Sequence, residues 1–509
     1  MTKKKKIEFG DFQTPIELTD NISKFIKTIF PTPNIIIEPT CGLGSFVKSC
    51  KSIWGTDCSY YGFDVNPQYI EKCNTNINGR GNCHFEVANF FQKNWKDLFL
   101  SYKKSKVLVV GNPPWVTNAA LGVLNSSNLP QKSNFQGLGG FAAKTGKANF
   151  DIAEWMLIKL IESLKGCNAC IAMLCKTATA RKVLKHFWIN NSQISNSSIH
   201  LIDAKQYFNV SVDACLFVTF VNSKDKSKDA YIYNNLSFRN EVTHLGIYAN
   251  ELIANIDDFE KYRDVDGIDY YKWRSGIKHD ASRAMELTKH NDKFKNGFGE
   301  YVEIESEYLY PLLKSSDLGN NRLTPRKYVI VTQKTVGENT IVIKKTAPKT
   351  WAYLEQYSSI LDSRKSIIYK NRPRFSVFGI GDYSFTSWKV AISGFYKGIH
   401  FCAIGQYEKK PIMVDDTCYF IPCSSKAEAI LFAQELNSEP CMKFLKSLIF
   451  FDAKRPINID ILRRIDFKKL SEINEKEDEV LRFLTYAQAP STQQLSLVFE
   501  KTEEYRTSG

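Results

Sequence analysis

The sequence predicts an α/β protein: an open, mostly parallel, doubly wound sheet with an antiparallel edge hairpin, followed by a mixed α+β region. Two observations predict this fold. Up to about residue 222, short apolar runs alternate with helical segments at the spacing of strand–helix units. A lysine-rich polar patch at 223–228 ends the alternation, and the remainder is aromatic, basic and irregular. We therefore expect one domain at 1–222, a second at 223–490 and a polar tail at 491–509.

Each element follows from its residues. Apolar, β-branched and aromatic runs predict strands at 34–38, 60–65, 84–87, 106–110, 169–175, 199–202 and 214–221. Helices are expected from about residue 45, from Pro67, which suits a first helical turn, and at 149–161 and 181–188. The last two strands are close enough in sequence to form the antiparallel hairpin. Beyond them, we expect strands at 328–331 and 341–343 and helices at 425–436 and 441–450.

Composition narrows the class of protein. A formal net charge of +14 and a pI near 9.0 favour a polyanionic partner, most simply nucleic acid. The sequence shows no secretory signal and no apolar run of membrane-spanning length. Cys167 and Cys170 form a single C-x-x-C pair without the further ligands of a zinc site. We expect a cytoplasmic protein of a bacterium or archaeon, associated with the nucleoid, with reduced thiols, no metal and no membrane contact.

The most informative motif is Asn112-Pro113-Pro114-Trp115, which follows the predicted strand at 106–110. The prolines stiffen the turn and remove two backbone donors, so the Asn amide oxygen and a backbone carbonyl can point into a pocket. Two acceptors side by side can hold an NH₂ group, and the indole offers a flat face to a ring. This arrangement suits methylation of an exocyclic amine on a nucleobase.

The residues around this turn carry no acid. Between Asp97 and Asp151 there is no Asp or Glu, and the lysines of that window are Lys103, Lys104, Lys106, Lys132, Lys144 and Lys147. The loop at 116–148 is long, and loops of this length are usually functional or disordered. We expect it to close over DNA near the target base, with Lys132, Lys144 and Lys147 near phosphates.

Three successive predicted strands end in groups that suit an adenosine. Glu38-Pro39-Thr40-Cys41-Gly42-Leu43-Gly44 follows the first strand, Asp64 ends the second, and Asn89-Phe90 follows the third. Glycines let the backbone approach a ligand, and a carboxylate after the second strand can accept both ribose hydroxyls. The third glycine of a dinucleotide fingerprint is missing, and Glu38 suits a cationic methionine moiety better than a pyrophosphate. We therefore favour S-adenosylmethionine.

Together these motifs resemble those of a γ-class N6-adenine DNA methyltransferase, the kind that accompanies restriction systems. Asp11-Phe12-Gln13-Thr14-Pro15 resembles the N-terminal cofactor motif of that family, and Tyr207-Phe208-Asn209 resembles the segment that stacks on the extruded adenine. The resemblance implies a Rossmann-like methyltransferase domain followed by a target-recognition domain. It implies cofactor contacts from Phe12, Thr14, Pro15, Glu38, Pro39, Cys41, Gly42, Gly44, Asp64, Val65, Asn89, Phe90 and Asn112.

The implied reaction is methyl transfer to the N6 amine of a flipped-out adenine. Asn112 Oδ1 and the Pro113 carbonyl would each accept one N6 hydrogen, with Pro114 stiffening the turn, and Trp115 and Phe208 would sandwich the ring. Two positions depart from the family pattern. Asn89 stands where the family has an adenine-contacting acid, and Trp115 stands where it has a tyrosine. The second departure keeps cytosine N4 open as the target.

The expected partner is double-stranded DNA, with a separate restriction endonuclease acting on the same site. Besides the three loop lysines, the candidates for DNA contacts are Arg274, Arg372, Arg374, Lys454 and Arg455. Methylation of adenine in RNA or of a protein glutamine uses the same chemistry and remains an alternative. A bifunctional restriction enzyme and a non-catalytic DNA-binding subunit are further alternatives, disfavoured by the lack of a nuclease-like acidic set and by the intact Asn112, Glu38 and Asp64.

Overall fold

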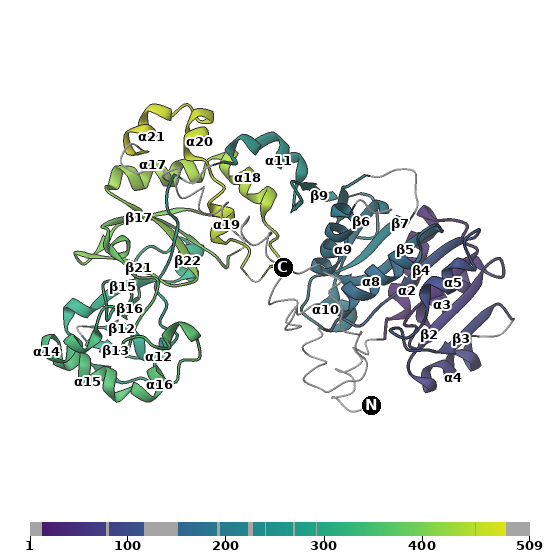
Figure 1. Ribbon diagram of the computed structural model, residues 1–509, viewed down its shortest axis with the longest axis horizontal. Helices are drawn as coiled ribbons and strands as arrows, with labels where there is room; N and C mark the ends of the chain where they lie inside the picture. The colour runs from purple at the N-terminus through teal and green to yellow at the C-terminus, as the bar shows by residue number, and fades with distance from the viewer. Residues whose placement is uncertain are drawn as a thin grey trace, which may run out of the picture. The chain divides into compact units, whose positions relative to one another are not determined.

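The computed structural model describes residues 13–77, 81–116, 151–190, 194–221, 227–239, 241–267, 270–291, 293–396, 398–453 and 455–484. The chain divides into two compact units, Met1–Ile256 and Asp257–Gly509. Figure 1 shows the elements of both units along the chain. Each unit is described by itself below.

The first unit is built on a ten-stranded sheet of order β10-β9-β8-β6-β7-β5-β4-β1-β2-β3. Strands β1 to β5 are parallel to their sheet neighbours within that set, whereas β7 is antiparallel to both β5 and β6. The strands are β1 (Ile35–Glu38), β2 (Ser59–Asp64), β3 (Cys83–Val87), β4 (Lys106–Gly111), β5 (Asn168–Lys176), β6 (Ile194–Ile202), β7 (Ala214–Val221), β8 (Ala230–Tyr233), β9 (Glu241–Tyr248) and β10 (Glu251–Ile253).

Helices cover both faces of this sheet. They are α2 (Ile16–Ile29), α3 (Ser45–Trp54), α4 (Pro67–Asn76), α5 (Trp95–Leu100), α8 (Ile152–Ser163), α9 (Thr177–Ile189) and α10 (Ala204–Phe208). Leu108 and Val110 of β4 share one hydrophobic core with α2 and α3. All four residues from Val107 to Val110 are fully buried, so the strand is covered on both sides. The predicted α/β doubly wound fold is confirmed.

The structure corrects two expectations about the first unit. The expected boundary at residue 222 lies inside the unit, because β8 pairs in parallel with β6 and continues the sheet through β9 and β10 to Ile256. The antiparallel pair of β6 and β7 forms as expected but lies within the sheet, since β5 and β8 flank it. Both differences arise from strand pairings that the sequence does not reveal, namely β8 with β6 and β7 with β5.

The second unit contains antiparallel and mixed sheets. One has the order β11-β22-β17-β18, a second has β14-β13-β12-β16-β15-β21, and β19 pairs with β20. The strands are β11 (Arg274–Ser275), β12 (Glu286–His290), β13 (Lys293–Lys295), β14 (Tyr301–Val302), β15 (Leu309–Leu313), β16 (Lys327–Ile330), β17 (Trp388–Ser393), β18 (Cys402–Ile404), β19 (Gln406–Tyr407), β20 (Lys410–Pro411), β21 (Met413–Val414) and β22 (Cys418–Cys423).

Short helices surround these sheets. The α-helices are α11 (Ile256–Tyr262), α12 (Ser282–Met285), α13 (Ser315–Gly319), α14 (Ile343–Thr346), α15 (Pro348–Gln356), α16 (Ser358–Asp362), α17 (Lys426–Leu436), α18 (Glu439–Leu448), α19 (Ile459–Leu462), α20 (Phe467–Ile473) and α21 (Glu477–Leu484). The 3₁₀ turns are η1 (Arg263–Val265), η2 (Ser306–Tyr308), η3 (Thr340–Val342), η4 (Ile367–Tyr369) and η5 (Asp382–Phe385). Among the described residues, no helix is long and apolar enough to cross a membrane.

The strand expected at 341–343 is wrong. The segment forms η3 and the start of α14, because the Asn339 side chain accepts a hydrogen bond from the Ile341 amide and caps a helical turn. Local capping therefore overrides the β-branched composition of this run. The strand expected at 328–331 and the helices expected at 425–436 and 441–450 are observed as β16, α17 and α18, with shifted ends.

Candidate active site

The site lies where parallel strands end. Glu38 ends β1, Asp64 ends β2, and Asn112 directly follows β4. Register places these ends at one edge of the sheet: Glu38 is opposite Gly62 of β2, and Asp64 is opposite Val87 of β3. Ligands of open parallel sheets bind at this edge, outside the carboxyl ends of the strands.

The loop between β1 and α3 wraps tightly around the end of β2. The Cys41 amide donates to the Phe63 carbonyl at 2.8 Å, and the Gly42 amide donates to Asp64 Oδ2 at 2.9 Å. Gly42 and Gly44 both have positive φ, 53° and 74°. A Cβ on Gly44 would lie 2.6 Å from Ile77 Cδ1, so only glycine fits there. The glycine motif forms a close backbone turn, as expected.

Asp64 is oriented by backbone amides. Besides the bond from Gly42, its Oδ1 accepts from the Asn66 amide at 2.8 Å, and Asn66 caps α4. The side chain is half-buried, and the following Val65 is exposed. The carboxylate is thus fixed in position at the end of the strand.

Glu38 is buried, with 3% of its surface exposed. Its Oε2 accepts from the Val47 amide in the first turn of α3 at 3.1 Å. Burial raises the pKa of this carboxyl well above its ordinary value, and that hydrogen bond offsets only part of the effect. Among the described residues no cation pairs with it. A positively charged ligand would be favoured next to this group once the carboxyl is ionised.

The segment before α2 contacts both the glycine loop and the turn formed by residues 112–115. Gln13 Oε1 accepts from the Leu43 amide at 3.0 Å, and Thr14 Oγ1 accepts from Asn112 Nδ2 at 3.3 Å. Pro15 then caps α2. Thr14 and Pro15 were expected near the cofactor, and the structure places both beside the site. Gln13 lies within the same motif, and its contact with the Leu43 amide was not predicted from the sequence.

Asn112 is the central polar group of the turn. Its Nδ2 is held by Thr14, whereas its Oδ1 is buried and has no hydrogen-bond partner within the described part of the chain. A buried acceptor without a donor is rare in proteins because it carries a desolvation cost of about 1–3 kcal/mol. The amide oxygen is therefore poised to accept a hydrogen bond from a ligand. Pro113 is buried and Pro114 half-buried beside it.

Trp115 and Phe208 come together from distant segments. Their ring centroids lie 5.3 Å apart with an interplanar angle of 69°, an edge-to-face contact. Rings that sandwich a base must be parallel and roughly 7 Å apart, twice a contact distance of 3.5–4.0 Å. The structure thus brings together the two predicted aromatic residues in direct contact, with no space for a base between them in this conformation.

A lysine that sequence reasoning missed supports the turn. Lys176, the last residue of β5, donates from Nζ to the Trp115 carbonyl at 3.0 Å and pairs with Asp151 Oδ2 at 2.6 Å. Asp151 also caps α8 by accepting from the Ala153 amide at 3.1 Å. The Ile152 amide donates to the Val116 carbonyl at 2.9 Å. Hydrogen bonds therefore connect the end of the turn at 112–116 to Lys176 of β5 and to the start of α8.

Asn89 and Phe90 follow β3 at the same edge. Asn89 Oδ1 accepts from the Phe91 amide at 2.9 Å, so the side chain closes a local turn. Phe90 is buried and packs on Trp95 with centroids 4.8 Å apart. Cys41 is also buried, close to Gly62. Phe90 and Cys41 are therefore buried at this edge of the sheet, and the Asn89 side chain bonds to its own loop.

The basic candidates of the second unit differ in their surroundings. Arg374 forms ion pairs with Glu355 and Asp362, both at 2.8 Å, and Arg274 stacks on Tyr383. Arg455 lies 3.9 Å from Asp416. Arg372 is exposed, with no ion pair among the described residues. The expected site residues Phe12, Lys132, Lys144, Lys147 and Lys454, and most of the loop at 116–148, lie outside the described residues.

The fold and the strand-end site define a class: the Rossmann-like methyltransferases that use S-adenosylmethionine. The model of the N-6 DNA methylase family matches residues 1–296, and the chain belongs to this family. It is 40% identical over 475 residues to Type II methyltransferase M.NspV of Nostoc sp., covering 92% of this chain and 98% of that protein.

Two further similarities are more limited. Type II methyltransferase M.CvrRI of Paramecium bursaria Chlorella virus XZ-6E is 27% identical over 117 residues, 23% of this chain and 27% of that protein. The Type IIL restriction-modification enzyme MmeI, solved in complex with DNA, aligns with a TM-score of 0.54. That alignment covers 97% of this chain and 76% of MmeI at 12% identity, so it supports the fold alone.

Proposed function

We propose that this protein transfers a methyl group from S-adenosylmethionine to the N6 amine of an adenine flipped out of duplex DNA at a specific sequence. We further propose that it is the modification component of a restriction-modification system. The observation that carries the proposal is the geometry of Asn112, whose amide nitrogen is held by Thr14 and whose buried oxygen accepts no hydrogen bond from any described residue. Membership of the N-6 DNA methylase family supports the same reaction.

The residues at the strand ends fit the cofactor. Asp64, fixed by two amides, would accept the ribose hydroxyls, and the Gly42–Gly44 turn allows a close backbone approach. Glu38 carries the cost of burial without a cation among the described residues, which suits the positively charged methionine end. When bound, S-adenosylmethionine would supply an electrophilic methyl group.

The chain's own residues would activate the amine by orientation. The N6 lone pair of adenine is delocalised into the ring and poorly nucleophilic. Hydrogen bonds from N6 to Asn112 Oδ1 and to the Pro113 carbonyl would favour a more tetrahedral nitrogen with a more available lone pair. Since the acceptors are held in place before the base arrives, little reorganisation is needed at the moment of transfer. Trp115 and Phe208 must separate to admit the base, which they would then stack against.

Three alternative substrates share this chemistry, because each presents a planar NH₂ group. Cytosine N4 in DNA is the nearest alternative, since Trp115 replaces the tyrosine of the resembled family. Adenine in RNA and a protein glutamine are more distant ones, and the net charge of +14 disfavours the protein substrate.

The decisive experiment is single-molecule sequencing of DNA from a methylation-free host that expresses the full chain, with Asn112→Ala as the inactive control. N6-methyladenine at one short motif, absent in the control, is the expected result. N4-methylcytosine would retain the mechanism and correct the base. Unmodified DNA, from protein that binds S-adenosylmethionine in calorimetry, would refute the DNA substrate and redirect the search to RNA and protein.

A further inference from the structure

We propose that two neighbouring loop segments of the second unit, 334–345 and 364–374, form a DNA-contact surface, called here the basic loop surface. The proposal rests on the proposed function and goes beyond it by locating where the duplex is held outside the base pocket. The two segments adjoin. Thr340 Oγ1 donates to the Arg374 carbonyl, and a Cβ on Gly337 would lie 3.7 Å from Arg372 Nη1.

The charge of this stretch of the chain is strongly positive. Residues 334–374 contain nine Lys and Arg and three Asp and Glu, a net charge of +6 out of +14 for all 509 residues. Six of the cations are exposed and form no ion pair among the described residues: Lys334, Lys344, Lys345, Lys365, Lys370 and Arg372.

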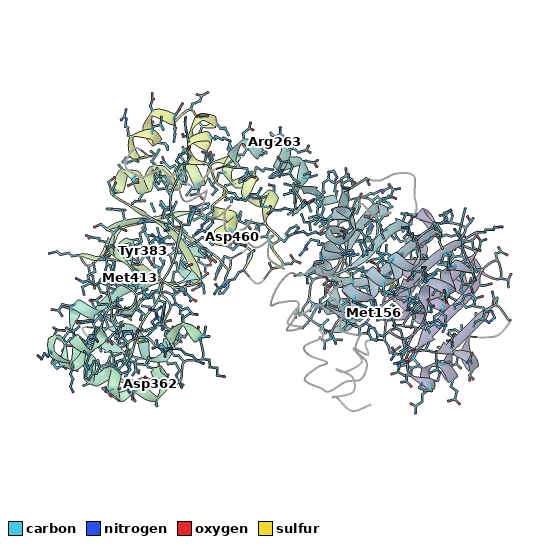
Figure 2. All side chains as sticks on the ribbon, viewed as in Figure 1. Met156, Arg263, Asp362, Tyr383, Met413 and Asp460 are labelled. Atoms are coloured by element: carbon cyan, nitrogen blue, oxygen red, sulfur yellow. The ribbon has the colours of Figure 1, made fainter. Side chains whose placement is uncertain are left out.

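The acids of the same segment are already engaged. Arg374 holds Glu355 and Asp362, the last residue of α16, which is labelled in Figure 2. Glu338 Oε2 accepts from the backbone amides of Lys334 and Thr335, at 2.7 and 3.2 Å, and so closes its own loop. The six cations therefore face solvent without local compensation from described residues, which is the electrostatic pattern of a phosphate-binding surface.

Aliphatic side chains stand among these cations. Ile367 is 75% exposed and Ile341 60%, and Val336 and Val342 are exposed as well. Exposed aliphatic residues alone would fit a protein partner. Combined with these six cations they fit duplex DNA better, because minor-groove proteins press aliphatic side chains between base steps while cations hold the phosphates.

The test removes charge from the full-length protein without touching the catalytic unit. A triple variant, Lys344→Gln, Lys345→Gln and Arg372→Gln, should weaken binding to a duplex carrying the methylation motif about 10-fold or more. It should also lower the slope of log affinity against log salt by roughly 2–3, because each phosphate contact contributes about 0.9. The matched control removes three cations from α18 and α20, Lys446→Gln, Lys468→Gln and Lys469→Gln, and should leave the slope unchanged.

Two other results have separate meanings. If the wild type methylates DNA and both triple variants show the wild-type slope, the surface assignment is refuted and the proposed function stands. If the wild type neither binds nor methylates DNA, the proposed function itself fails. Ile367→Ser should reduce affinity without changing the salt slope. Unchanged DNA affinity, with lost binding to a purified partner endonuclease, would instead make this patch a protein interface.

A second inference stands on different contacts: we infer that Lys176 is a positioning residue for the catalytic turn. Its ammonium group joins the Trp115 carbonyl to the buried Asp151, 3.0 and 2.6 Å away. Trp115 is three residues from Asn112 in a turn stiffened by two prolines, so a shift of its carbonyl would move the Asn112 amide. Lys176 would act on the reaction through the turn, without touching the base.

The neighbouring ion pair provides a matched control. Lys182 of α9 pairs with Glu154 of α8 at 3.2 Å, and Lys176 and Asp151 are the N-cap residues of the same two helices. Lys176→Met should lower kcat about 10- to 100-fold, since a misplacement of about 1 Å can cost 100-fold, while the Kd values for S-adenosylmethionine and duplex stay within about 2-fold. Lys182→Met should leave kcat unchanged, and Lys176→Arg should restore part of it.

The readouts separate positioning from stability. An equal loss of Tm in both Met variants, with kcat lowered to the same extent, would make Lys176 merely structural. An unchanged kcat in Lys176→Met would also overturn the inference. Asp151→Asn, which keeps the shape of the helix cap and removes the charge partner, should lower kcat in the same direction as Lys176→Met.

Discussion

Each unit contains a buried glutamate at a strand, and the pKa values of the two glutamates are shifted in opposite directions. Glu38 in the first unit is 3% exposed and Glu286 in the second is 4% exposed. Burial raises the pKa of Glu38 well above its ordinary value. Burial acts on Glu286 too, but hydrogen bonds from His279 and Lys314, with their charges, outweigh it and lower its pKa to about 2.

The two carboxyl groups differ in how far the chain itself compensates their burial. Glu286 is compensated within the fold by Lys314 at 2.7 Å and His279 at 3.5 Å. Glu38 accepts a hydrogen bond from the Val47 amide but has no cation beside it among the described residues, so the effect of its burial is only partly offset. Groups whose burial is left uncompensated by the chain are characteristic of ligand sites, because the ligand completes their environment. Asn112 Oδ1 belongs to the same category.

The largest effect on stability is expected in the second unit. Glu286→Ala leaves His279 and Lys314 without their carboxylate partner. Breaking a buried ion pair costs about 3–5 kcal/mol. We expect the free energy of unfolding to fall by that order in urea titrations. Glu303→Ala removes an exposed ion-pair partner of Lys349 and should leave the free energy of unfolding nearly unchanged, because solvent screens such a pair. Equal effects of both variants would contradict the comparison.

Glu38→Gln should affect ligand binding more than folding. The amide keeps the shape and the bond from Val47 but removes the charge expected to hold the cationic cofactor. A hydrogen bond to a charged group is worth about 1.5–3 kcal/mol, so the Kd for S-adenosylmethionine should rise about 10- to 100-fold in calorimetry. Glu71→Gln on the exposed face of α4 serves as control. A loss of stability with unchanged cofactor affinity would make Glu38 a structural residue.

The pH dependence of stability should have opposite signs for the two carboxyls. The folded-state pKa of Glu286 lies below its ordinary 4.5, so its stabilisation is present above pH 4.5 and is lost as the pH falls toward 2. The folded-state pKa of Glu38 is raised, so its contribution is complete below pH 4.5 and is lost as the pH rises above that value. The free energy of unfolding, measured from about pH 3 to 8, should therefore depend less on pH below 4.5 in Glu286→Gln. In Glu38→Gln it should depend less on pH above 4.5. Identical profiles for the two variants would contradict the assigned directions.

The smallest effect distinguishes two arginines of the second unit. Arg374 is committed to Glu355 and Asp362 on a half-exposed surface, and such pairs contribute about 0–1 kcal/mol. Arg374→Gln should thus change Tm slightly and DNA affinity little, whereas Arg372→Gln should reduce DNA affinity and leave Tm unchanged. A gel-shift titration beside a thermal melt measures both. The reverse result would remove Arg372 from the basic loop surface.

The comparison also explains what the sequence could predict. In the first unit, parallel strands carry their carboxyl ends to one edge, so Glu38, Asp64 and Asn112 could be grouped from strand order alone. The glycine turn was equally predictable, because positive φ at Gly42 and Gly44 is a local property. The α/β fold and the antiparallel pairing of β6 with β7 followed from the same alternation.

The remaining features depend on partners far along the chain. Lys176 meets a carbonyl 61 positions away, and no motif marks it. The ion pairs of Arg374 with Glu355 and Asp362 depend on the fold around α15 and α16, so the sequence could not predict them. The helical turn at 340–342 was missed because one capping asparagine outweighed three β-branched residues. Strands β8 to β10 were missed because β8 is placed by pairing with β6, and β9 and β10 follow from β8.

The edge-to-face contact of Trp115 and Phe208 has a kinetic consequence. In the proposed reaction, an entering base would first have to separate these rings, whose mutual attraction is worth about 0.5–1.5 kcal/mol, a factor of roughly 2 to 10 in equilibrium. The threshold is the same for every base, so it cannot select adenine. Under the proposed function, it would instead shorten the time that any base stays in the site, so that long occupancy would require the additional hydrogen bond to Asn112.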